Sequence, residues 1–172
     1  MVSNEYAKAL FELATEYDIL DTISENLTAF CISLKENKDY MKVLTYPEIS
    51  NKEKKKSIDK VYRSFDKLFI RFLYVLVDND EMKNVFDIER GYNEIVDELN
   101  NIKSIDVYSK ESLDDNQLAI VHDALKGYFK GKKIILNNIV DPSLIGGITI
   151  MSNNQLLDLS FNSKLESLKK AL

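Results

Sequence analysis

The sequence predicts an N-terminal all-α bundle of six helices joined to a smaller C-terminal α+β domain. In the first hundred residues, apolar side chains recur with a period near 3.6, whereas strand-like alternation appears only from about residue 102. The charge divides at nearly the same place. Residues 1–105 hold 15 Lys/Arg and 20 Asp/Glu, and residues 106–172 hold 8 of each. The 172 residues therefore fit two small domains, expected at 1–104 and 105–172.

The expected helices follow from apolar spacing and from caps. Ser3 is a candidate N-cap of the first helix, and a second helix starts at Asp21 or Thr22. Ser50 and Glu53 have capping-box spacing ahead of a further helix. The remaining helical segments are a short turn over 41–44, an almost wholly apolar helix over 68–77 and an amphipathic helix over 82–101. The lysines at 54–56 are expected on a solvated helix face.

The C-terminal part alternates between strand and helix signals. Strands are expected over 102–109, 134–140 and 148–151, with a returning strand over 156–159. Helices are expected over 113–129 and 160–172. A turn at 141–143 and a bend at the pair Gly146 and Gly147 separate the second and third strands.

Composition excludes many function classes. One Cys and one His in the whole chain leave no cysteine- or histidine-based metal site, and no cofactor motif such as GxxxxGK[ST] or GxGxxG occurs. Cys31 is expected to be a buried hydrophobe. His122 adjoins Asp123, but neighbours in a helix do not face each other, so no dyad is built locally. We therefore expect no enzyme, no cofactor and no metal, although a small hydrolase using Cys31 or His122 stays open as an alternative.

The net charge of −5 gives no bulk attraction to nucleic acid. No basic leader precedes an apolar run at the N-terminus, and the apolar segment 68–77 is too short to span a bilayer. We expect a soluble cytosolic protein that binds no nucleic acid and does not insert into a membrane. Attachment to a membrane through a partner stays open.

At this point several motifs resemble a known family. The segment 141–148, Asp-Pro-Ser-Leu-Ile-Gly-Gly-Ile, looks like the signature of the delta subunit of F-type ATP synthase, the bacterial counterpart of the oligomycin-sensitivity-conferring protein. The signature positions are Asp141, Pro142, Leu144, Gly146, Gly147, Asp158, Ser160 and Leu165. The opening 6–11, Tyr-Ala-Lys-Ala-Leu-Phe, also resembles the family. The chain departs from the family pattern at Glu5, Arg71, Asp80 and Lys110.

The resemblance implies a non-catalytic stator subunit in the peripheral stalk of a proton-translocating ATP synthase, at the cytoplasmic face of the bacterial cell membrane. The helical domain would bind the N-terminal helix of an F1 alpha subunit, and the C-terminal domain the b subunits of F0. The residues expected to meet the alpha helix are Tyr6, Ala7, Leu10, Phe11, Ala14, Phe69, Phe72, Leu73 and Val77. On this expectation, Ala14→Asp weakens alpha binding without unfolding the bundle. The alternative function is an unrelated cytosolic helical adaptor.

Overall fold

The computed structural model describes residues 2–145, 147–152 and 155–156 and divides them into two compact units, Met1–Val96 and Asp97–Leu172. The division falls within one helix, earlier than the expected boundary at 104/105. Residues 102–104 already belong to a strand of the second unit. The predicted boundary is therefore displaced, because the last helix of the first unit runs on into the second without a linker.

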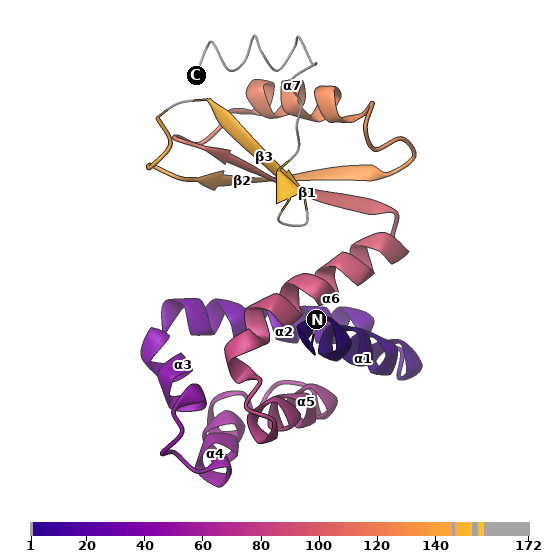
Figure 1. The fold of residues 1–172 in the computed structure, drawn as a ribbon. Coiled ribbons are helices and arrows are strands. Elements are labelled where there is room, and N and C mark those ends of the chain that lie inside the picture. Colours follow the sequence, from indigo (N-terminus) through magenta and orange to yellow (C-terminus); the bar gives the residue numbers. More distant parts are fainter. Residues whose placement is uncertain (1, 146, 153–154, 157–172) are drawn as a thin grey trace. The chain divides into compact units, whose positions relative to one another are not determined.

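The first unit is helical (Figure 1). Its elements are α1 (Val2–Glu16), α2 (Leu20–Glu36), α3 (Lys38–Thr45), α4 (Asn51–Val61), α5 (Lys67–Asp78), the 3-10 turn η1 (Met82–Asn84) and α6 (Val85–Leu99). Helical backbone already begins at Val2, so Ser3 lies in the first turn of α1 and does not cap it. The capping box of α4 is confirmed, with Ser50 and Glu53 each accepting from the other's backbone N–H.

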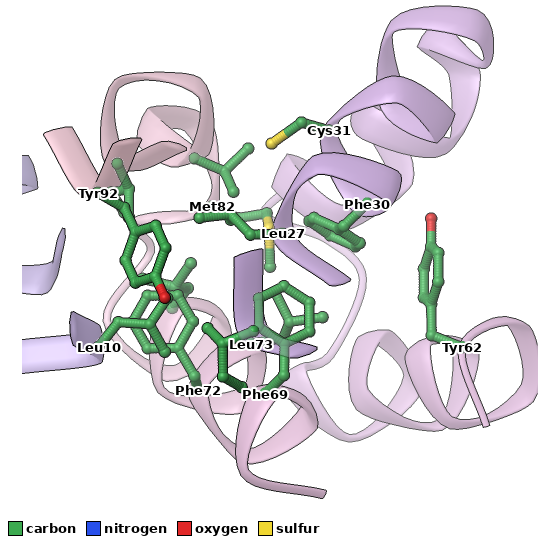
Figure 2. Packing of buried hydrophobic residues seen from close by; sticks show 14 of the residues in the cluster. Leu10, Leu27, Phe30, Cys31, Tyr62, Phe69, Phe72, Leu73, Met82 and Tyr92 are labelled. Carbon is green, nitrogen blue, oxygen red and sulfur yellow. The ribbon is translucent and has the colours of Figure 1, made fainter. Parts of the chain in front are cut away.

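One apolar core holds the helices of the first unit together (Figure 2). Its largest buried side chains include Leu10, Leu27, Phe30, Phe69 and Tyr92. A chain of edge-to-face and stacked rings crosses this core, and buried tyrosine hydroxyls have partners, as required for polar groups away from water. Such a core gives the unit one fixed arrangement of helices.

Local features at its two ends explain where α5 begins and ends. Asp66 caps the helix by accepting from the Leu68 N–H. At the other end Asp80 adopts φ 55°, a left-handed conformation that favours glycine, at one of the positions where the chain departs from the family pattern. The helix predicted over 68–77 is confirmed to within one residue at each end, as Lys67–Asp78.

The second unit is a mixed four-stranded sheet with a helix on one face (Figure 1). The strands β1 (Ile102–Ser109), β2 (Lys133–Val140), β3 (Ile148–Ser152) and β4 (Gln155–Leu156) lie in the order β2-β1-β3-β4. β1 and β2 are parallel, which the intervening α7 (Asp115–Leu125) makes possible, and the other pairs are antiparallel. A separate core, which includes Ile105, Val107, Val121 and Leu125, lies between α7 and the sheet.

Two expectations for the second unit need correction, and others fall on residues outside the described part of the chain. The helix predicted over 113–129 is shorter, because Asp114 caps it at the start and turns follow Leu125 before Gly131, which has φ 81°. β4 begins at Gln155, one residue earlier than expected. The helix expected over 160–172 and the signature positions Gly146, Asp158, Ser160 and Leu165 lie outside the described residues.

Candidate docking face on α1 and α5

Among the residues that the structure describes, neither side chain considered for catalysis has the partners that catalysis needs. Cys31 is wholly buried, and burial, with the nearby Glu89 carboxylate as a second cause, raises the pKa of its thiol well above the usual range. A neutral buried thiol is a poor nucleophile. His122 Nδ1 lies 3.9 Å from Asp123 Oδ1 in a partly exposed pair on the helix surface. In the described part of the chain, no group of three or more His, Cys, Asp or Glu residues is placed to hold a metal.

Most residues expected to meet the alpha helix are core residues. Of that set, only Tyr6 and Phe11 are more than marginally exposed. Those that are buried are Ala7, Leu10, Ala14, Phe69, Phe72, Leu73 and Val77. Their role in the structure is to hold α1 and α5 in place, because both helices direct these side chains into the same cluster. The expectation that Ala14→Asp spares the fold needs correction, since it would bury a carboxylate.

The small residues of α1 also have a different neighbour from the one expected. Ala7 packs against Gly91 of α6. The centres of the Phe11 and Tyr92 rings lie 6.3 Å apart, in an edge-to-face arrangement. The helix that approaches α1 closely along this side is therefore α6 of the same chain. Tyr6 lies on the other side of α1, where its ring makes an edge contact with Phe72 of α5 at a centroid distance of 6.5 Å.

An exposed apolar row runs along α1 beside Tyr6. Leu13 follows Tyr6 by seven residues, which places both near one side of the helix. Tyr17, the first residue after α1, continues this side, and its N–H donates to the Leu13 carbonyl at 3.1 Å. The exposed fractions are 39% for Leu13 and 62% for Tyr17. Large apolar side chains in one row, next to a filled core, are unusual on a free surface and favour a docking role.

The opposite side of α5 is already occupied by α4. The Tyr74 hydroxyl donates to the Asp59 carboxylate, and Lys55 Nζ lies 5.4 Å from the centre of the Tyr74 ring and 2.5 Å from Asp78 Oδ2. Together with Asn51, which donates to Asp78 at 3.4 Å, these contacts tie α4 along this flank. These contacts leave the other flank of α5, with the exposed Val75, as the apolar surface that a partner can reach.

The free flank of α5 is apolar and adjoins the row on α1. Leu68 is half-buried, and Val75 is 45% exposed. Both lie on the same row as Phe72, one turn before and one turn after it, and Phe72 is the residue that Tyr6 contacts. We call the surface formed by Tyr6, Leu13, Tyr17, Leu68 and Val75 the α1/α5 face.

In the second unit the described part of the signature is a structural turn. The Asp141 carboxylate accepts from the Ser143 N–H at 3.0 Å and from the Ser143 hydroxyl at 2.6 Å, and these bonds lower the pKa of Asp141. The Asp141 N–H donates to the Ser109 carbonyl at 2.8 Å. Gly147 has φ 75° directly before β3, which explains a glycine there. This described part of the signature therefore shapes the β2–β3 connection and contributes no catalytic group there.

The described residues thus form two small units, with an exposed apolar face on α1 and α5 and, among these residues, no assembled catalytic site. The model of the family "ATP synthase delta (OSCP) subunit" matches residues 2–172. ATP synthase subunit delta of Acetivibrio thermocellus is 30% identical over 173 residues, covering 100% of this chain and 97% of the relative. That of Lactobacillus johnsonii is 28% identical over 171 residues, covering 99% and 94%.

A solved structure has the same fold. A chain of the Toxoplasma gondii mitochondrial ATP synthase hexamer matches with a TM-score of 0.72 at 17% identity, covering 99% of this chain and 97% of that one. The chain belongs to the ATP synthase delta (OSCP) subunit family, whose members are structural, non-catalytic subunits of the ATP synthase peripheral stalk. The whole-chain match confirms the resemblance seen in the sequence and displaces the alternative of an unrelated adaptor.

Proposed function

We propose that this chain links the F1 alpha/beta hexamer to the b subunits of F0 in a proton-translocating synthase. The α1/α5 face takes the N-terminal helix of an alpha subunit, and the second unit takes the C-terminal ends of the b subunits. This places the chain at the cytoplasmic face of the cell membrane, held there by its partners. In the described part of the chain, no helix is long and apolar enough to cross a bilayer by itself.

The observation that carries the proposal is the exposed apolar row over a rigid base. Leu13, Tyr17 and Val75 offer side chains to a partner. Beside them, the Tyr6 ring makes an edge contact with Phe72, which in turn stacks on the buried Phe69. An amphipathic helix laid on such a face buries roughly 800 Å² per partner at standard interface size. Nanomolar affinity corresponds to about −12 kcal/mol, and a preformed base avoids the cost of ordering the site.

The second unit offers a different apolar surface. α7 covers one face of the sheet, and the alternate residues of β2 point to the other face. On that face Ile135 and Ile139 are 37% and 38% exposed, and Tyr108 lies directly across from Ile139 in the β1–β2 register. These side chains support, for the described part of the second unit, the proposal that it holds apolar segments of the b subunits.

The α1/α5 proposal is tested by titrating a synthetic peptide of the alpha subunit N-terminus into the full chain by calorimetry. Leu13→Glu and Val75→Glu each place a charge within the face without touching the core. We expect each to weaken binding by at least about tenfold, the effect of roughly 1.4 kcal/mol, with a near-native free energy of unfolding. Ile32→Glu is the matched control, because Ile32 is 47% exposed on α2. Equal affinities for all variants would contradict the proposal.

A further inference from the structure

Three glutamates border the α1 side of the α1/α5 face. Glu5, Glu12 and Glu16 are exposed and recur at spacings of seven and four residues, so they form one row. On the helix surface this row follows directly after the apolar row of Leu13, on the side away from the core. Lys8 lies behind the glutamates, farther from the face. Within the described residues none of the three glutamates forms an ion pair.

The α5 side of the face has the opposite charge. Lys67 and Arg71 are exposed and lie one turn apart, and Arg71 precedes Val75 by one turn. They therefore border the apolar row of Leu68 and Val75 on its outer side. Asp78 continues this row, but its carboxylate is paired with Lys55 of α4 at 2.5 Å. The face thus has an acidic rim on α1 and a basic rim on α5.

From these two rims we infer that the α1/α5 face binds an amphipathic helix with basic residues on the flank over α1 and acidic residues on the flank over α5. The inference rests on the proposed docking function and adds the direction of the bound helix. Turning a helix end for end, with its apolar stripe still on the face, exchanges its two flanks. Opposite rims therefore select one of the two directions.

The rims act mainly on orientation. Exposed ion pairs contribute little affinity each, but like charges placed opposite one another disfavour the wrong arrangement. When two or more exposed ion pairs form along each rim, we expect the bound helix to populate one direction about three- to tenfold more than the other at low salt. The preference fades at roughly 0.5 M salt, where exposed charges are screened within a few ångströms.

The test uses two designed peptides with the same stripe of leucines and the same composition. One has lysines on the first flank and glutamates on the second, and the other has the flanks exchanged. Each peptide carries a nitroxide at its N-terminus and is bound to the ¹⁵N-labelled full chain. We expect the nitroxide to broaden amides near one end of α1, around Tyr6 or around Tyr17, with one peptide and near the opposite end with the other.

Charge variants show whether the rims cause the difference. In Glu12→Lys/Glu16→Lys the α1 rim keeps only Glu5 as an acidic residue and becomes net basic like the α5 rim, so each peptide should broaden both ends of α1. Glu25→Lys/Glu36→Lys makes the same change in charge at two exposed positions of α2. In this control each peptide should still broaden amides at only one end of α1. If both peptides broaden the same end of the wild-type chain, the inference is overturned while the docking face stands. If neither peptide perturbs α1 or α5, the docking face itself is overturned.

Discussion

Gly91 of α6 lies so close to Ala7 of α1 that a methyl group placed on Gly91 would come within 3.2 Å of the Ala7 Cβ atom. The same methyl group would lie 3.2 Å from Asn4 Oδ1. A glycine within a helix is unfavourable by itself, so this one has a packing reason. The contact sets how closely α6 approaches α1 along the row of Ala7, and α6 leaves the neighbouring row of Leu13 exposed for the α1/α5 face.

Enlarging Gly91 should therefore destabilise the first unit. We expect Gly91→Val to lower the free energy of unfolding by about 1–3 kcal/mol, because its branched side chain cannot fit between the two helices. Chemical denaturation checks this. Gly127→Val is the control, since a Cβ atom there meets nothing within 4 Å, and it should change the free energy by no more than about 0.5 kcal/mol. Equal losses for the two variants would contradict the packing role of Gly91.

The Cys31 thiol should be unreactive in the folded chain. It is buried in the core of the first unit, and this burial is the main cause that raises its pKa. The nearby Glu89 carboxylate raises the pKa further, so little of the thiol is present as the reactive thiolate. We expect Ellman's reagent to modify it only as fast as the first unit opens, and at once in denaturant. Because the folded pKa is the raised one, Cys31 stabilises the fold below the unfolded thiol pKa of about 8.5 and loses that contribution as pH rises above it. Rapid modification of the native chain at neutral pH would contradict this.

The capping box of α4 predicts an effect of acid. Glu53 accepts from the Ser50 hydroxyl at 2.6 Å and from the Ser50 N–H at 3.1 Å, and these bonds lower the pKa of Glu53. Because the folded pKa is depressed, this contribution to stability is present above the unfolded pKa of about 4.3 and is lost as pH falls through the folded value. We expect Ser50→Ala to raise the pKa of Glu53 in a carboxyl-carbon NMR titration. An unchanged titration midpoint would show that the box does not form.

The two units should keep separate cores when one is removed. Residues 97–101 complete α6 and its turn, so a deletion of 102–172 leaves that helix whole, whereas a cut after 105 would leave Ile105 and half of β1 behind. We expect the shortened chain to unfold cooperatively with helical circular dichroism and to bind the alpha peptide as the full chain does. It should no longer retain b subunits in a pull-down. Retention of b would place that partner on the first unit.

The helices of the first unit could be predicted from the sequence because their apolar spacing and caps are local. The choice of which apolar residues face outward could not. α1 has two adjacent apolar rows, one through Ala7 and Ala14 and one through Tyr6 and Leu13, and periodicity alone does not say which row a neighbouring helix covers. The positions of α5 and α6 decide it, because α6 packs onto Ala7 and leaves Leu13 exposed.

Lys54 is a second residue whose exposure could not be predicted from the sequence. The lysines at 54–56 were expected on a solvated face, but Lys54 is only 2% exposed and Lys55 pairs with Asp78. Lys54 precedes Ile58 by one turn and so lies on the buried row of α4, where its long aliphatic stem can be covered. Val61, an apolar residue at the end of the same helix, is by contrast 55% exposed.

The most direct test of the central claim is the map of amide shift changes when the alpha N-terminal peptide is added to the ¹⁵N-labelled full chain. The largest changes should lie along α1 and α5, at and around Leu13, Tyr17 and Val75, with Ile32 and the sheet of the second unit unaffected. Changes confined to the second unit, or spread over α2 and α4 instead, would contradict the assignment of the α1/α5 face.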